Sequence, residues 1–422
     1  MDLVMDTLRA VSSAIVEPKH FFMVIILGII FYLKNIKIVA IQKMTIGDKL
    51  NSPIELTCSQ LVLGILAGAG GSVLLNLLGV TFSENSGIGF IFIVSILLLY
   101  FKKRFVCFSY SGAVIGLLSI VMGIVYKTIG KTPFLSVNIM SLVTLVGVLH
   151  IVEGILVMID GSRGAIPVFT KKGNKIVGGF SFSRYWAIPI ALLMMLSNDS
   201  FTTGTIIANT PTWWPIINKK EVLDLLTKAT IICFPLYGMV GYNTFSFTKN
   251  KKAKAISSGI CVFVYGLSLI AVAQIANIKT IGELIAIIYM PIGHELMLKY
   301  QKYVENKGEY LYVSDDEGIT VLEVAPNSPA FNVGIRGGDK ILAINGHDII
   351  GEADIFNALK NNIFKIPLKV KRTSGEIKEY IVQPRNKRIG VLLVPKMVKV
   401  SDMVDAEGQE FKKILDELRK KK

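Results

Sequence analysis

The chain is poor in charged residues, histidine and cysteine. Charged residues make up 18% of its 422 residues, whereas a soluble protein averages about 25%. The four cysteines include no CxxC pair, which argues against a disulfide framework or a zinc knuckle and favours small core side chains. No basic stretch precedes an apolar run at the N-terminus, so we expect no cleavable signal peptide.

Apolar and basic residues are in excess. Hydrophobic residues make up 52% of the chain, and the formal net charge is +15. The Lys and Arg residues cluster in short loops between long apolar runs. Membrane topology and anionic lipid headgroups explain this pattern better than nucleic acid does. We therefore predict contacts with membrane lipids and no nucleic-acid partner.

Residues 1–300 contain stretches close to the roughly 20 apolar residues that cross a bilayer. The candidate spans are 21–41, 59–80, 87–101, 105–125, 135–159, 185–197, 229–247, 256–278 and 280–298. Polar residues weaken the first and last of them, and 185–197 is short. We therefore predict a membrane-embedded, all-α polytopic helical bundle of about 7–9 spans. Close contact between helices would be possible at Gly64, Gly68, Gly70 and Gly71, and a homo-oligomer stays open.

The loops between these spans alternate between basic-rich and basic-poor. The basic-rich loops are 34–58, 102–104, 160–184 and 249–254. Loops rich in Lys and Arg stay in the cytoplasm. The alternation therefore predicts a multi-pass protein of the bacterial cell membrane, with everything after Lys299 in the cytoplasm.

The polar last third of the chain carries the motifs of a small folded domain. They are an alternating strand at 317–324, Ser328-Pro329-Ala330, Gly334-Ile335, Gly337-Gly338-Asp339-Lys340-Ile341 and Ile344-Asn345-Gly346. Their order and spacing resemble a bacterial PDZ domain. The resemblance covers about 310–395 and implies a small α+β domain, which we place at 309–396. Such domains bind a partner peptide as an added strand, with its terminal carboxylate on backbone N–H groups.

In the circularly permuted bacterial form of this domain, the carboxylate-binding loop can come from the end of the domain. Here 388–392 takes that position, where Gly390 allows close backbone approach and Arg388 adds positive charge. The groove helix would be 352–361. The predicted peptide-binding residues are Arg388, Ile389, Gly390, Val391, Leu392, Ala353, Phe356 and Asn357.

The C-terminal segment 401–422 has one apolar face and a basic end. This pattern predicts a short amphipathic helix. Its target could be a partner helix, the anionic membrane surface or the chain's own PDZ domain.

Ionisable groups at membrane depth are functional candidates. His150 and Glu153 share a helix face, and His294-Glu295 lies in the last predicted span. These residues could hold a zinc ion, with His150, Glu153 and His294 as ligands and Glu295 as a general base. The other interpretations are a hydrogen-bonded His–Glu pair that joins two helices, and wet residues near the membrane interface.

His294-Glu295 is similar to the start of the HExxH motif of site-2 intramembrane proteases, which also carry PDZ domains. The chain departs from that pattern, because Leu298 stands where the second His belongs and the PDZ motifs follow all the spans. A divergent intramembrane zinc metalloprotease therefore stays an alternative. A transporter is a second alternative, since Pro235 and Gly238 interrupt an apolar stretch, as in broken transporter helices.

The multi-span part, the segment 150–164, Gly293-His294-Glu295 and a PDZ domain after the last span together resemble the MinJ family. That family consists of cell-division topology determinants that link a polar scaffold to the Min system. The resemblance implies no enzyme and no cofactor. It implies an integral membrane scaffold whose PDZ domain recruits division or Min proteins.

Overall fold

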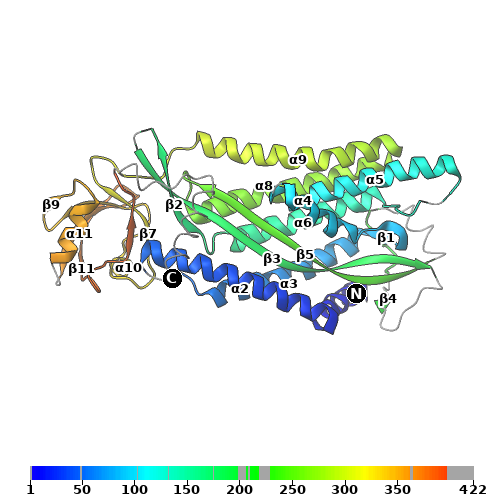
Figure 1. Ribbon diagram of the computed structural model, residues 1–422, viewed down its shortest axis with the longest axis horizontal. Coiled ribbons are helices and arrows are strands. Elements are labelled where there is room, and N and C mark those ends of the chain that lie inside the picture. Colours follow the sequence, from blue (N-terminus) through cyan, green and yellow to red (C-terminus); the bar gives the residue numbers. More distant parts are fainter. Residues whose placement is uncertain are drawn as a thin grey trace.

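The molecule is elongated, with long helices along most of its length and a small α+β domain at one end (Figure 1). The computed structural model describes all residues except 1, 48–49, 102, 132, 174, 198–205, 208–209, 218–228, 362–364 and 397–422. The amphipathic helix predicted at 401–422 lies outside the described residues.

Within the described residues, six helices are long and apolar enough to cross a membrane. They are α2 (Pro18–Ile46), α3 (Pro53–Leu78), α5 (Phe108–Ile129), α6 (Ile139–Asp160), α8 (Lys251–Ala273) and α9 (Lys279–Lys307). Each has 22–29 residues, at least the length that a bilayer core requires. The predicted helical membrane part is confirmed at this level.

Helix α6 is the centre of the bundle. In its most apolar 18-residue window 78% of the residues are buried, against 22–39% in the other five helices, so these five present most of the lipid-facing surface. Helix α8 packs closely along α6, because a Cβ on Gly154 would lie only 2.7 Å from the Gly259 carbonyl oxygen. Gly147 and Gly266 make the same kind of contact farther along. Small residues allow this close approach of backbones.

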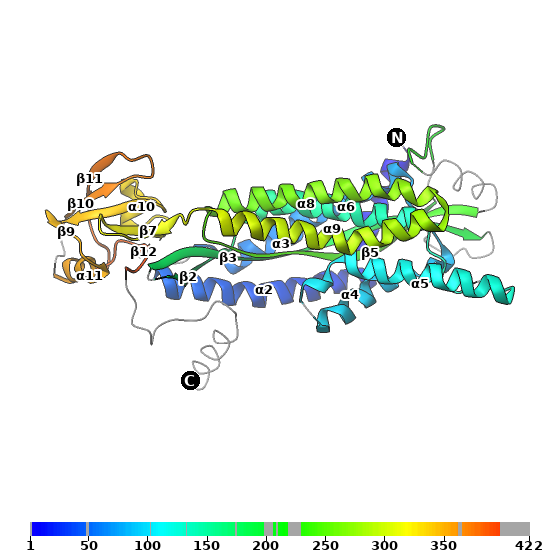
Figure 2. The ribbon, with the colours of Figure 1, turned by 90° about the horizontal axis from the view of Figure 1, so that it is seen from above.

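Two of the predicted spans are strands, not helices. The segments 185–197 and 229–247 fall in β3 (Lys175–Ser197) and β5 (Ala229–Ser246). These strands pair antiparallel from Phe180↔Ser246 to Ser197↔Ala229 and run along the bundle (Figure 2). At about 3.3 Å per residue, the 18-residue β5 is about 60 Å long, so the hairpin is longer than a bilayer core of about 30 Å.

Prolines in both segments disfavour a helix without excluding it, since α9 is a helix with Pro291 inside it. An apolar run alone does not distinguish a strand from a buried helix. Pro189 and Pro235 lie inside the two segments, and a proline in a helix interior costs about 3 kcal/mol. The Pro/Gly-interrupted stretch around Pro235, which kept a transporter open, is accordingly part of β5.

The glycines of α3 bring this helix against the hairpin. A Cβ on Gly64 or Gly68 would lie 2.1 or 2.2 Å from the carbonyl oxygens of Ala187 and Pro189. The Ala191 N–H donates to the Ser72 hydroxyl of α3 at 2.9 Å. Gly64 and Gly68, which were expected to allow helix–helix contact, therefore admit a strand, whereas Gly71 does lie against Val152 of α6. Non-helical backbone is tolerated at membrane depth where protein buries it in this way.

Shorter elements complete the membrane part. The predicted span 87–101 corresponds to α4 (Phe90–Phe101), whose 12 residues reach only about 18 Å, too short to cross. The other elements are α1 (Asp2–Val16), β1 (Thr81–Ser83), η1 (Glu84–Ser86), η2 (Lys103–Val106), β2 (Ile166–Lys172), β4 (Ile206–Ile207) and η3 (Gln274–Asn277). β1 and β2 pair with β3, and β4 pairs with β5.

The C-terminal domain has its own sheet and core. Its elements are β7 (Ile319–Val324), α10 (Pro329–Val333), β8 (Lys340–Ile344), β9 (His347–Asp348), α11 (Glu352–Asn361), β10 (Ile366–Lys371), β11 (Ile377–Val382) and β12 (Val391–Leu393). The strands lie in the order β11-β10-β8-β7-β12, with β9 beside β8. Ser328 caps α10, and Gly334 ends it in the left-handed conformation, as is usual for these residue types.

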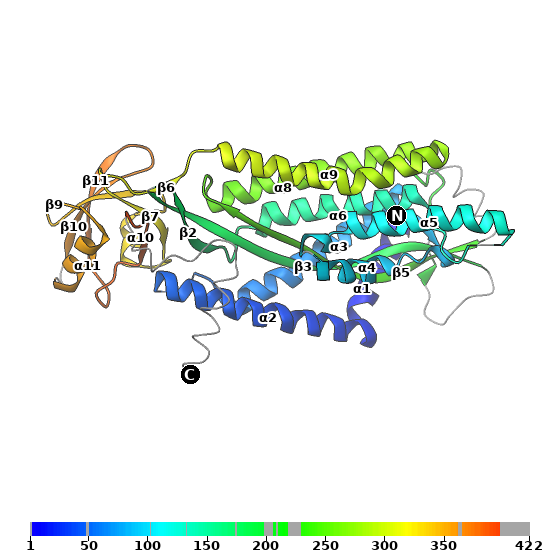
Figure 3. The same cartoon turned by 45° about the horizontal axis from the view of Figure 1, so that its top comes forward.

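This domain is joined to the hairpin by backbone and side chains. The linker strand β6 (Tyr312–Val313) pairs with Val177 and Gly178 of β3 and lies between the two parts of the molecule (Figure 3). Lys251 at the start of α8 forms an ion pair with Glu323 of β7. The domain therefore lies against one end of the bundle.

Candidate functional sites

The edge strand β12 is the first candidate site. It pairs antiparallel with β7, with Val391 opposite Val324. Within the described ranges, no strand pairs with its other edge. An edge without a strand partner keeps backbone donors and acceptors available, which an added peptide strand requires, and α2 and the bundle core lie nearby, with Leu392 packed against that core.

The loop before β12 is shaped by Gly390. This residue has a φ of +76°, and a Cβ there would lie 2.3 Å from the Cβ of Ser328, so only glycine fits. Its carbonyl accepts from Ala325 N–H at 2.8 Å, and the carbonyl of Ile389 accepts from Ala330 N–H at 3.0 Å. The Ile389 side chain is buried in the domain core. The loop is thus fixed against the start of α10, next to the open edge.

Helix α11 has one face in the core and one exposed face. Ile355 and Leu359 are buried in the domain core. The predicted residues Ala353, Phe356 and Asn357 are all exposed, and Phe356 is 62% exposed. At the start of the helix, backbone N–H groups of Gly351 and Ile350 donate to Asp354 and lower the pKa of its carboxyl group.

Arg388 lies against the membrane part. Helix α2 ends at Gly47, whose φ is +85° and whose N–H bonds to the carbonyl of Lys43. A Cβ on Gly47 would lie 2.6 Å from Nη1 of Arg388. The C-terminus of a helix carries partial negative charge, so this position favours a guanidinium. The charge predicted to attract a peptide carboxylate therefore lies where the PDZ domain meets α2.

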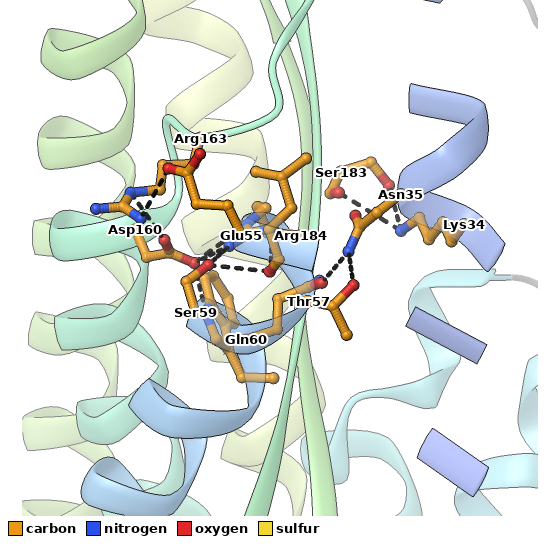
Figure 4. Close-up of polar contacts among 12 residues, drawn as sticks. Lys34, Asn35, Glu55, Thr57, Ser59, Gln60, Asp160, Arg163, Ser183 and Arg184 are labelled. Atoms are coloured by element: carbon orange, nitrogen blue, oxygen red, sulfur yellow. Dashed lines mark hydrogen bonds and ion pairs between the residues drawn. The ribbon is translucent and has the colours of Figure 1, made fainter. Parts of the chain in front are cut away.

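A second cluster is a buried ion pair between the hairpin and the helices (Figure 4). Arg184 of β3 and Asp160 of α6 have fully buried side chains. Arg184 Nε donates to Asp160 Oδ2 at 3.0 Å, and its Nη2 donates to Ser59 Oγ of α3 at 2.7 Å. Trp186 Nε1 donates to the same Asp160 oxygen at 2.9 Å. Sequence reasoning identified the segment around Asp160 but not its partner Arg184. Arg184 lay in a basic loop that was used only to predict membrane topology.

A third cluster contains the two predicted membrane histidines. His150 of α6 and His294 of α9 lie with ring centroids 5.9 Å apart. Glu153 is not in this group, although it lies three residues from His150 on the same helix. Glu295 accepts from Tyr110 Oη at 2.7 Å and from Arg104 at 3.2 Å.

Cys107 takes the position expected for Glu153. Its Sγ lies 3.1 Å from His150 Nε2. Potential ligand atoms of Cys107, His150 and His294 all lie within 4.8 Å of one another. Sequence reasoning assigned this cysteine to the core, because its distance from both histidines along the chain leaves no spacing motif to detect.

Comparison with known proteins agrees with the two-part architecture. A family model described as PDZ domain matches residues 320–372, so the chain carries a PDZ domain. The cell division topological determinant MinJ of Bacillus subtilis is 19% identical over 233 residues, 55% of each chain. The probable MinJ proteins of Lacticaseibacillus paracasei and Lacticaseibacillus casei are each 24% identical over 122 residues, 29% of this chain and 31% of theirs. The chain thus spans about half, or less, of the length of these relatives.

Proposed function

We propose that this protein is a non-enzymatic membrane scaffold that binds partner proteins through its PDZ domain and positions components of cell division. The similarity to MinJ proteins and the PDZ domain together support a role in cell division. The observation that carries partner binding is the open edge of β12 beside the Gly390 loop. Main-chain hydrogen bonds to such an edge give affinity, and neighbouring side-chain pockets give specificity.

The cytoplasmic side of the PDZ domain is supported by where the basic residues lie. The helix and strand ends and the turns at the PDZ end of the bundle contain Lys43, Arg163, Lys171, Lys172, Lys175, Lys249, Lys251, Lys252 and Lys254. The opposite end has few, among them Lys127, Lys131 and Lys279. Because Lys and Arg are retained in the cytoplasm, this end faces the cytoplasm. Arg104 is different, since it pairs with Glu295 within the bundle.

Gly390→Ala tests the binding site. A Cβ at this position meets Ser328 and the backbone has a positive φ, so the carboxylate loop must change shape. We expect full-length Gly390→Ala to insert into membranes normally but to lose binding to division proteins of the same organism in a membrane two-hybrid assay. In cells lacking the native protein, we also expect it to fail to restore normal placement of division sites.

Gly375→Ala is the matched control. Gly375 also has a positive φ, of +88°, but a Cβ there meets nothing within 4 Å, and it lies in the turn between β10 and β11. The Gly375→Ala variant has the same kind of backbone strain but does not touch the proposed groove. It should therefore keep partner binding and restore normal placement of division sites. Equal binding and complementation by the two variants would contradict the proposed groove.

A further inference from the structure

Three side chains that could bind one metal ion converge inside the bundle. Cys107 precedes α5, His150 lies midway along α6, and His294 lies on α9. His150 and His294 are only 2% and 8% exposed. One potential ligand atom from each lies within 4.8 Å of the others. The three come from separate elements, so the group exists only because these elements pack together.

The hydrogen bonds of His150 determine which of its nitrogens can bind a metal. Its Nδ1 lies 2.7 Å from the carbonyl oxygen of Val146. A carbonyl only accepts, so Nδ1 carries the proton and Nε2 is unprotonated, with Ser109 Oγ 3.4 Å away. That Nε2 lies 3.1 Å from Cys107 Sγ. Metal-binding histidines donate their other ring N–H in this way.

A chain of hydrogen bonds gives His294 the same tautomer. Tyr110 Oη donates its proton to Glu295 Oε1 at 2.7 Å, and Arg104 pairs with the other oxygen of that carboxylate. The Tyr110 oxygen lies 3.1 Å from His294 Nδ1 and has its proton engaged, so it accepts from Nδ1–H. The Nε2 of His294 is therefore unprotonated and able to bind a metal.

We infer that Cys107, His150 and His294 bind a zinc ion within the membrane part. A thiolate and two neutral imidazoles suit zinc, which binds them at about 2.0–2.3 Å in tetrahedral geometry, so small side-chain movements bring all three atoms to one ion. Three protein ligands leave a fourth position for water or another ligand. The site goes beyond the scaffold function and does not depend on it.

The ion joins the turn between α4 and α5 to α6 and α9. The carboxylate of Glu295 is held by Tyr110 and Arg104, so it orients His294 through the tyrosine and is not free to activate water as a general base. By joining three separate elements, the bound zinc would stabilise the packing of these helices.

Metal analysis of the full-length protein tests this site. The protein, purified in detergent through a tag without histidine after growth with zinc, should retain one zinc ion per chain after dialysis, measured by plasma mass spectrometry. Cys107→Ala and His294→Ala should each lose it, and Cys107→His should keep it. Cys261→Ala and His347→Ala are the matched controls, and they should retain wild-type zinc.

A second measurement uses wild-type protein, so that misfolding of a variant cannot mislead. A small thiol reagent, followed by peptide mass mapping, should modify Cys107 only after a strong chelator is added. Exposed Cys58 should react equally with and without the chelator. Wild-type protein without zinc, copper in place of zinc, zinc unchanged in both ligand variants, or Cys107 reactivity independent of chelator would each overturn the inference.

Discussion

Each guanidinium nitrogen of Arg184 has a partner although the residue is fully buried. Nε and Nη2 bond to Asp160, Nη2 also to Ser59, and Nη1 to the carbonyl of Leu56. A buried ion pair adds little net stability, but removing one partner leaves the other charged and unpaired. The pair therefore determines where β3 lies against α3 and α6.

Asp160→Asn should strongly destabilise the membrane part. Asparagine keeps the size but leaves the buried charge of Arg184 uncompensated, which costs about 3–5 kcal/mol. Thermal unfolding in detergent measures the effect as a lower melting temperature. Arg163→Ala removes partly exposed ion pairs to Asp160 and Glu55, each worth about 0–1 kcal/mol. The double variant Asp160→Leu with Arg184→Met should recover most of the loss, and failure to recover would mean that the charge itself is not responsible.

At the scale of elements, α3 and the hairpin are in contact through glycine backbones. Gly64→Ala places a Cβ against the carbonyl of Ala187, so strand and helix must separate and the melting temperature should fall. Gly70→Ala on the same helix meets nothing within 4 Å. Alanine favours helix over glycine by about 1 kcal/mol, so Gly70→Ala should be neutral or stabilising. Equal effects of the two substitutions would show that α3 does not depend on this close approach.

The sequence predicts an element well when the residues that determine it lie close together in the chain. The elements of the PDZ domain were predictable because motifs such as Asn345-Gly346 and Gly337-Gly338-Asp339 are local signals. The segments that form β3 and β5 were wrongly predicted to be helices. Their pairing joins residues far apart in the chain, so a local pattern does not reveal it. The prediction of the zinc-binding residues was incomplete for the same reason. His150 and His294 stood out as polar residues in apolar runs, but only tertiary packing brings Cys107 to them.

At the scale of the whole molecule, the basic loops and the PDZ domain lie at the same end of the bundle. The ion pair between Lys251 and Glu323 and the pairing of β6 with β3 hold the domain there. The Gly390 loop meets the end of α2, where Arg388 lies against Gly47. A partner bound on β12 would therefore lie beside this end of the bundle.

Labelling with a membrane-impermeant thiol reagent tests this orientation. Ser83 lies at the end of the bundle opposite the PDZ domain, Ser374 lies in the PDZ domain, and both are exposed. In a Cys58→Ser background, Ser83→Cys should react in intact cells, whereas Ser374→Cys should react only after the membrane is permeabilised. The two variants carry the same substitution and differ only in position, so each controls for the other. Reaction of Ser374→Cys in intact cells would place the PDZ domain outside, where it could not recruit cytoplasmic division proteins.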